Sequence, residues 1–115
     1  FGPYKNHPCN PVVTNPINAR MGGNILEKDG SIYRFGQNNC YGYGEKITVN
    51  KIKDLSTEIY EEEIVSEICI SDYKGPHTIN FIEKKMVLDF YKNKLSLFAG
   101  LRRIIPKLLK IRNYL

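Results

Sequence analysis

Asp29-Gly30 lies between two runs of strand-forming residues, 24–27 and 31–37, and this arrangement constrains the fold more than any other feature of the chain. An Asp-Gly pair in such a position is the strongest short-range signal for a β-hairpin. The surrounding stretch, 15–44, also concentrates arginine, amide and tyrosine side chains among glycines. These groups suit a polar, uncharged ligand such as a sugar, so the sequence predicts a hairpin that also carries a binding surface.

Further strand-like runs follow at short spacing. Apolar and polar residues alternate over 45–53 until Ile52 falls out of phase, which predicts a bulge or a strand end. The stretch 60–70 is ambiguous, because its glutamates suit the start of a helix whereas its last two isoleucines fit a strand better. We interpret the glutamate run 61–63 as the solvent-exposed face of this stretch.

Two later runs, 77–82 and 86–91, predict a second hairpin with Lys84-Lys85 at its tip. The expected fold class is therefore mainly β, an antiparallel meander of four strands between residues 20 and 70 followed by two more. Four antiparallel strands make one propeller blade, so residues 1–91 would form about one and a half blades of a partial β-propeller domain. A small sandwich or a partial barrel fits the same pattern nearly as well.

The C-terminal stretch, 92–115, differs in charge and in period from the residues before it. It holds seven of the 17 basic residues and none of the 12 acidic ones, so the body of the chain is mildly acidic. Leucine and isoleucine recur there at helical spacing around Pro106, which predicts a basic amphipathic helix that ends or kinks at the proline. Such a tail suits an anionic membrane surface, or packs its apolar side on protein. The acidic body argues against a nucleic-acid partner.

Nothing in the sequence indicates a metal or cofactor site. Cys9, Cys40 and Cys69 are far apart, no C-x-x-C spacing occurs, and the two histidines stand alone. We expect reduced cysteines in a cytoplasmic protein, peripheral to a membrane where the tail binds lipid; one disulfide with a free thiol is the open alternative. The chain shows no secretory signal and no apolar run of membrane-spanning length, and its start at Phe1 suggests a fragment or a processed product.

Several motifs occur in one order along the chain. They are His7-Pro8, Asn10-Pro11-Val12, Ala19-Arg20-Met21-Gly22-Gly23, Ile32-Tyr33-Arg34-Phe35-Gly36-Gln37, Tyr43-Gly44 and His77-Thr78. Together they resemble the N-terminal domain of the plant glucosamine inositolphosphorylceramide transferases and of their bacterial, formyltransferase-associated relatives. One departure is Asn38, where the family often has aspartate, and this weakens an acidic role at that position.

The resemblance implies a five-bladed β-propeller, of which this chain would be only the closing part. It also implies a fused or adjacent transferase domain. In related enzymes the acidic catalytic residues lie largely in earlier blades. The catalytic residues are therefore unknown here, membership of an enzyme stays uncertain, and the fragment alone is not expected to be active.

We therefore predict a carbohydrate-associated fragment that binds a sugar or sugar-nucleotide beside a glycan-modifying transferase activity. The predicted ligand-binding residues are Arg20, Arg34, Gln37, Asn38, Tyr43 and His77. Arginine offers a planar fork of donors, and tyrosine offers a face that stacks on a sugar ring. A structural role, bracing a loop or filling the core, is the alternative for each residue.

Two other functions remain open at this point. In the first, the chain is part of an active propeller of the glycosidase or glycosyltransferase type, and the catalytic acids lie upstream of it. In the second, the chain is a structural domain whose tail docks on a membrane or a partner.

Overall fold

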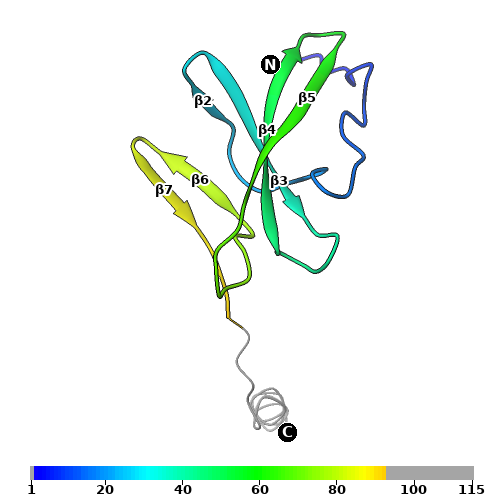
Figure 1. The fold of residues 1–115 in the computed structure, drawn as a ribbon. Coiled ribbons are helices and arrows are strands. Elements are labelled where there is room, and N and C mark those ends of the chain that lie inside the picture. The colour runs from blue at the N-terminus through cyan, green and yellow to red at the C-terminus, as the bar shows by residue number, and fades with distance from the viewer. Residues whose placement is uncertain (1, 93–115) are drawn as a thin grey trace, which may run out of the picture.

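The computed structural model describes residues 2–92, and every regular element in that range is a β-strand (Figure 1). The strands are β1 (Arg20–Met21), β2 (Leu26–Lys28), β3 (Ser31–Asn38), β4 (Lys46–Leu55), β5 (Tyr60–Ile68), β6 (Ile79–Ile82) and β7 (Lys85–Leu88). All strand pairs are antiparallel. The mainly β fold class is therefore confirmed, whereas the helix predicted for 92–115 lies outside the described residues except for Lys92.

The strands form a larger and a smaller sheet. The larger sheet has the order β1-β3-β4-β5, and β2 also pairs with β3, while β6 and β7 form a two-stranded hairpin. A parallel bridge between Gly23 and Ile79 joins the two sheets, and the Ile79 N–H donates to the Gly22 carbonyl at 2.7 Å. A Cβ on Gly23 would lie 1.6 Å from the Ile79 carbonyl oxygen, so this close approach requires glycine.

Both predicted hairpins are confirmed. Lys28 pairs with Ser31 across the two-residue loop Asp29-Gly30, whose φ angles of 50° and 69° are those of the type I′ turn that suits the twist of a hairpin. In the second hairpin Ile82 pairs with Lys85, so the tip is Glu83-Lys84 rather than the predicted Lys84-Lys85. Glu83, with φ of 56°, takes the left-handed conformation in this turn.

The long strand pair β4–β5 is irregular. The sequence predicted a bulge or a strand end at Ile52; the structure has a register shift between Ile52 and Asp54, so the bulge is the correct alternative, and a second shift occurs between Val49 and Asn50. The ambiguous stretch is a strand, β5, and lies at the outer edge of the larger sheet. Bulges at an edge increase the local twist and disfavour pairing with another chain.

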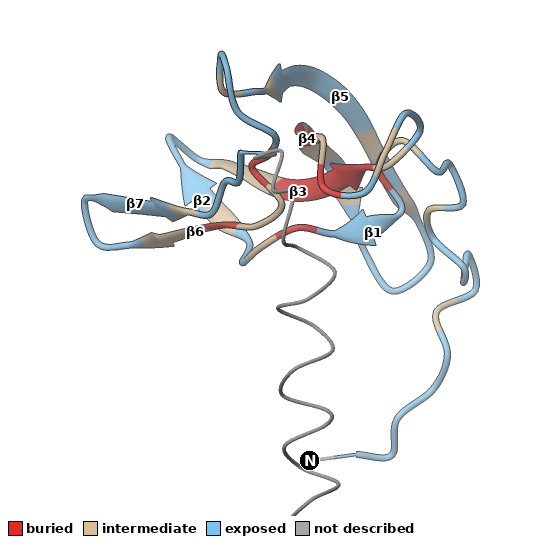
Figure 2. Ribbon diagram, turned by 90° about the horizontal axis from the view of Figure 1, so that it is seen from below, coloured by how far each residue is buried: buried red, intermediate tan, exposed pale blue. Residues whose placement is uncertain are grey.

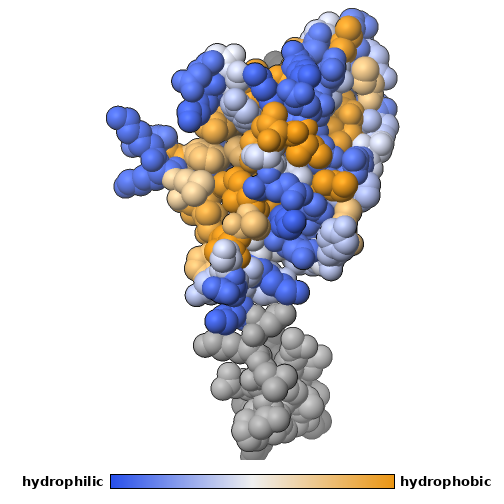
Figure 3. Space-filling model, in the orientation of Figure 1, coloured by the Kyte–Doolittle hydropathy of each residue, from blue (hydrophilic) through white to orange (hydrophobic). Residues whose placement is uncertain are grey.

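One face of the larger sheet, which we call the apolar face, carries the hydrophobic core. Phe35 of β3 and Ile47 of β4 are almost fully buried there against Ile79 of β6. The rings of Phe35 and Phe81 lie 5.3 Å apart between their centroids. Figure 3 shows hydrophobic side chains gathered between the β6–β7 hairpin and the larger sheet. Removal of these side chains from water adds to the Gly23–Ile79 bridge in holding the smaller sheet on the larger one.

The opposite face, which we call the polar face, is also buried but carries polar side chains. Arg34 of β3 lies beside Thr48 and Asn50 of β4, and each of the three is less than a tenth exposed. The N-terminal segment, 10–19, covers them so closely that a Cβ on Gly36 would lie 2.5 Å from the Asn18 carbonyl oxygen. Figure 2 shows the buried residues concentrated in β3 and the adjoining part of β4.

Candidate functional site

Strand alternation divides the six predicted ligand-binding residues between the two faces. Successive side chains of a strand point to opposite faces, so Arg34 and Asn38 of β3 lie on the polar face and Gln37 lies on the apolar face. Arg20 of β1 is paired with Gln37 and lies on the same face as Gln37. The structure therefore brings together four of the six residues and separates the other two from them.

These four residues, Arg20, Gln37, Tyr43 and His77, form what we call the tyrosine cluster. The Arg20 guanidinium carbon lies 5.5 Å from the centroid of the Tyr43 ring, and the Tyr43 and His77 rings lie 4.6 Å apart. The Tyr91 hydroxyl donates to the Tyr43 carbonyl at 2.9 Å and so ties the loop after β3 to the end of the second hairpin. Cation–π attraction favours the position of the guanidinium over the ring.

Asp89 positions the histidine of this cluster. Its Oδ1 accepts from the backbone N–H groups of His77 at 2.9 Å and Thr78 at 2.6 Å, and its Oδ2 lies 3.6 Å from His77 Nδ1. Burial alone would raise the pKa of Asp89, but the two backbone hydrogen bonds outweigh it and hold that pKa below its ordinary value. Asp89 therefore stays ionised and fixes the backbone from which the His77 ring extends.

Two buried atoms of the tyrosine cluster have no hydrogen-bond partner. They are Oε1 of Gln37 and Nε2 of His77. Buried polar groups are nearly always paired, so each unpaired atom calls for an explanation, and a ligand group is one. The exposed guanidinium of Arg20 adds a charged group with several donors. The cluster therefore offers a ligand the Arg20 donors, the Gln37 amide oxygen and the His77 ring nitrogen.

Arg34 is bound to Glu62 on the polar face. Its Nε donates to Glu62 Oε2 at 2.7 Å and its Nη2 donates to Oε1, a bidentate pair in which both side chains are more than nine-tenths buried. The interpretation of the glutamate run 61–63 as a solvated face is therefore wrong for its middle residue. Glu61 and Glu63 are exposed, and alternation along β5 turns Glu62 inward.

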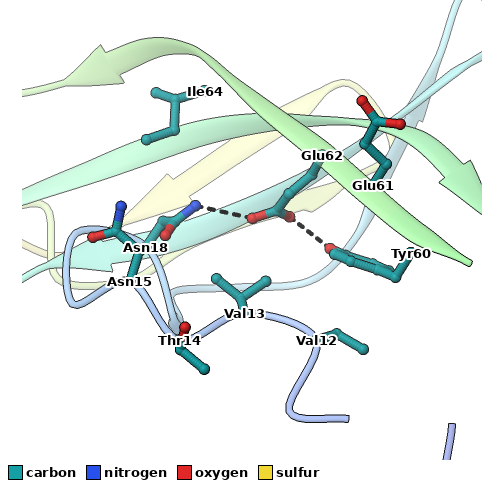
Figure 4. A pocket seen from close by; sticks show the side chains of 9 residues that line it. All are labelled: Val12, Val13, Thr14, Asn15, Asn18, Tyr60, Glu61, Glu62 and Ile64. Atoms are coloured by element: carbon teal, nitrogen blue, oxygen red, sulfur yellow. Dashed lines mark hydrogen bonds between the residues drawn. The ribbon is translucent and has the colours of Figure 1, made fainter. Parts of the chain in front are cut away.

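Glu62 has its full complement of hydrogen bonds. Besides Arg34 it accepts from the Tyr60 hydroxyl at 2.6 Å and from Asn18 Nδ2 at 2.9 Å. Figure 4 shows Asn18 and Tyr60 reaching the carboxylate from opposite sides. Two donors on each oxygen leave no free lone-pair position, so Glu62 has no capacity to accept a substrate proton.

The pKa values of Glu62, Tyr60 and Arg34 agree with a structural role for this hydrogen-bonded group. Burial disfavours the charged form of Glu62, but the hydrogen bonds from Arg34 and Tyr60 and the charge of Arg34 prevail and lower its pKa. Burial together with the bond to Glu62 raises the pKa of Tyr60 to about 12. Burial alone would lower the pKa of Arg34, but Glu62 raises it, so the ion pair is fully charged across the physiological range.

Asn38, the other separated residue, is also engaged. Its Nδ2 donates to Glu67 Oε1 at 3.0 Å, and its Oδ1 accepts from the Cys40 N–H at 3.1 Å. Lys46 in turn contacts Glu67 at 3.1 Å, and the Lys46 ammonium is the main cause of the lowered pKa of Glu67. A role for Arg34 or Asn38 in binding ligand stays a prediction, whereas these contacts give both a structural role.

Sequence reasoning missed Glu62 and Asn18. Neither belongs to a recognisable motif, because their partners lie 28 and 32 positions away at Arg34 and Asn50. Among residues 2–92 no group of three or more histidine, cysteine or acidic side chains is arranged to hold a metal ion. All three cysteines are free and exposed. The same residues contain no helix long and apolar enough to cross a membrane.

Comparison with known proteins identifies relatives. The family model described as "Glucosamine inositolphosphorylceramide transferase 1, N-terminal" matches residues 1–96. Glucosamine inositolphosphorylceramide transferase 1 of Arabidopsis thaliana is 38% identical over 86 residues, 73% of this chain. Proteins of the same name from the indica and japonica subspecies of Oryza sativa are 38% identical over 64 residues, 54% of this chain.

The chain spans about a tenth of the length of these curated relatives, 11% of the Arabidopsis protein and 9% of each rice protein. No solved structure matches the chain. The relatives are named as transferases, and the family model covers most of the sequence. The chain therefore belongs to the family defined by the N-terminal domain of glucosamine inositolphosphorylceramide transferase 1.

Proposed function

We propose that this chain supplies a sugar-binding surface to a larger glycan-modifying transferase, and that the tyrosine cluster binds a sugar or sugar-nucleotide. One observation carries the proposal. Arg20, Tyr43 and His77, which are far apart in sequence, lie in contact in one row, and buried atoms of Gln37 and His77 beside them lack partners. The names of the relatives supply the link to glycan modification.

The chemistry of the cluster suits such a ligand. The guanidinium fork of Arg20 matches a phosphate or two adjacent hydroxyls, and charge-assisted hydrogen bonds of this kind are among the strongest in proteins. Gln37 Oε1 accepts from a hydroxyl, and His77 Nε2 donates or accepts according to its tautomer. Tyr43, which is 60% exposed, adds an aromatic surface for the apolar side of a sugar ring.

Binding is a better account of this chain than catalysis. Glycoside hydrolysis needs two carboxylates at a fixed separation, one of them able to exchange a proton. Glu62 has all its lone pairs occupied, and Asp89 is held by the backbone of His77 and Thr78. The acids and the transfer step would then come from the rest of the transferase.

We also propose that the strands belong to a β-propeller. The antiparallel order β1-β3-β4-β5 is that of one four-stranded blade, and the β6–β7 hairpin follows as the start of the next. In such a ring the tyrosine cluster, at the β1 edge of the larger sheet, would face the central channel where propellers bind ligands.

Calorimetric titration of the 115-residue chain with uridine diphosphate glucose tests the site. Arg20→Ala should weaken binding about tenfold, because loss of one charge-assisted contact costs about 1.5 kcal/mol or more. Tyr43→Ala should weaken binding by a similar factor, because it removes the ring over which Arg20 is placed. Lys53→Ala is the matched control, since Lys53 is an exposed cation of β4 that contacts only Glu63 among the ion pairs of the described residues.

Free glucose and uridine diphosphate, titrated separately, show which half of the ligand the cluster holds. A broader glycan array extends the search to other sugars. Equal affinity for the parent chain, Arg20→Ala and Tyr43→Ala would contradict the proposal, as would the absence of binding to every sugar and nucleotide sugar tried.

A further inference from the structure

A hollow of about 210 Å³ lies on the polar face, between the N-terminal segment and strands β1 and β3. Its walls are residues 10–13 and Ala19 of that segment, Met21 of β1 and Arg34 of β3. Most of these side chains are apolar, and no acidic side chain is among them. Pockets that hold a whole ligand are usually larger than about 300 Å³, so this hollow suits a small group carried by a larger molecule.

Arg34 brings a donor nitrogen to this hollow. Glu62 binds the Nε and Nη2 atoms of the guanidinium. The third nitrogen, Nη1, donates to Met21 Sδ at 3.7 Å and makes no other hydrogen bond in the described structure. Because Met21 is itself a wall of the hollow, Nη1 lies on the side of the guanidinium toward it. Thioether sulfur is a weak acceptor, so the donor capacity of Nη1 is largely unused although Arg34 is 6% exposed.

The surroundings of Nη1 favour an acceptor without charge. Glu62 already neutralises Arg34, and no second cation lines the hollow, so a carboxylate would give up its hydration for a single donor nitrogen. A hydroxyl would bring a proton that needs an acceptor. Apart from the exposed amide of Asn10, the side chains of the wall offer no oxygen for it. A carbonyl oxygen accepts hydrogen bonds and needs no acceptor in return.

We propose that this hollow is a second binding site, which takes the acyl group of a neutral amide or ester. The carbonyl oxygen of the ligand accepts from Arg34 Nη1, and the small apolar groups beside that oxygen contact Val13, Ala19 and Met21. The ion pair stays intact, so Glu62 holds the guanidinium in the orientation that binds the ligand. The site is independent of the tyrosine cluster, which lies on the other face of the sheet.

The methyl resonances of the two methionines test the site in the full 115-residue chain. Met21 and Met86 are similarly exposed, 46% and 54%, but Met86 lies on β7 and does not line the hollow. The probe is N,N-dimethylacetamide, which has a carbonyl acceptor and no donor, titrated to about 200 mM because so small a ligand binds weakly. The Met21 methyl and Arg34 Nε–H signals should shift and saturate together, while the Met86 methyl signal stays in place.

Titrations with 2-propanol and with acetate test the kind of acceptor that the hollow prefers. 2-Propanol should bind about fivefold more weakly than N,N-dimethylacetamide, because its hydroxyl proton lacks a good acceptor in the hollow. Acetate should also bind more weakly than N,N-dimethylacetamide, because its charge loses hydration there.

Two substitutions in the wall separate binding in the hollow from a general solvent effect. Ala19→Leu fills part of the hollow and should weaken binding by about tenfold or more. A thermal melt confirms that this variant is folded, which is expected because Ala19 is exposed. Met21→Leu keeps an apolar wall of similar volume but removes the sulfur that competes for Nη1. Binding to this second variant, followed at Arg34 Nε–H, should tighten by about threefold.

The inference is overturned if N,N-dimethylacetamide shifts the Met21 and Met86 signals equally or shifts neither, or if 2-propanol or acetate binds as tightly. It is also overturned if Ala19→Leu binds like the parent chain, or if Met21→Leu binds no more tightly than the parent chain. Arg20→Ala should not change the binding of N,N-dimethylacetamide, because Arg20 lies on the other face. Failure of this second site is therefore distinguishable from failure of the tyrosine cluster.

Discussion

The two faces of the larger sheet are buried by different means. On the apolar face Phe35, Ile47 and Ile79 lose contact with water, and the contacts have no strict direction. On the polar face Arg34 and Glu62 are buried to a similar extent, and the face is stable only because every charge meets a partner with the correct geometry. On the apolar face, the loss of stability should therefore grow with the size of the group that a substitution removes. On the polar face, even a small substitution should cost nearly the full stability of the ion pair.

Glu62→Gln should cause the largest loss of stability. The change keeps the shape of the side chain but leaves the Arg34 guanidinium buried without its counter-charge, which costs about 3–5 kcal/mol. Urea unfolding of the variant and the parent chain measures the difference in free energy. Glu63→Gln is the matched control because Glu63 is exposed on the same strand, and its midpoint should be unchanged. Equal midpoints for the two variants would remove the distinction between the faces.

Ile47→Ala should cost about 2–5 kcal/mol, whereas Ile47→Val should cost only about 0.5–1.5 kcal/mol. The smaller change deletes one methylene group from a fully buried side chain and leaves most of the contacts in place. The same unfolding measurement applied to Glu62→Asp sharpens the comparison, since shortening the carboxylate by one methylene should cost nearly as much as Glu62→Gln. A graded response on both faces would contradict the account.

Gly36→Ala should destabilise the chain by about 1–3 kcal/mol, the usual cost of overpacking. The new methyl group would lie 2.5 Å from the Asn18 carbonyl oxygen and 2.8 Å from Thr48 Oγ1, so the N-terminal segment must move away from the polar face. Gly42→Ala is the control, because a Cβ there meets nothing within 4 Å. Thermal melts compare the two, and an unchanged midpoint for Gly36→Ala would show that the segment does not pack as described.

Acid should weaken the polar face, though by less than the substitutions above. The pKa of Glu62 is lowered from 4.5 by folding, so its contribution is fully present above that value and is lost as pH falls through the lower folded pKa. The parent chain should therefore lose stability more steeply than Glu62→Gln below about pH 4.5. Glu67 and Asp89 also have lowered pKa values, but both proteins contain them and their effects cancel in the comparison. Parallel curves of stability against pH would contradict the assignment.

Local signals predicted the hairpins, and long-range contacts account for what the sequence left open. Asp29-Gly30 predicted its turn because the required conformation depends on those two residues alone. The two-residue strand β1 is too short for any periodicity to reveal it. The inward position of Glu62 depends on Arg34, 28 residues earlier, so the glutamate run by itself looked like a solvated surface.

The candidate site, too, was predicted only as far as local signals allow. The sequence singled out Arg20, Gln37, Tyr43 and His77, which the fold brings together, but its predicted ligand-binding residues also included Arg34 and Asn38. Alternation along β3 places those two on the other face, and that division follows only once the strand is known to extend through Asn38. The role of Asp89 in positioning His77 carries no signal in sequence, because its partners lie 11 and 12 residues away.

Mapping the resonance shifts caused by uridine diphosphate glucose onto the two faces tests the central claim most directly. The account predicts that the signals of Arg20, Gln37, Tyr43 and His77 shift together and saturate at one affinity, while those of Asn18 and Ile64 stay in place. Shifts confined to the polar face, or none on either face, would contradict it.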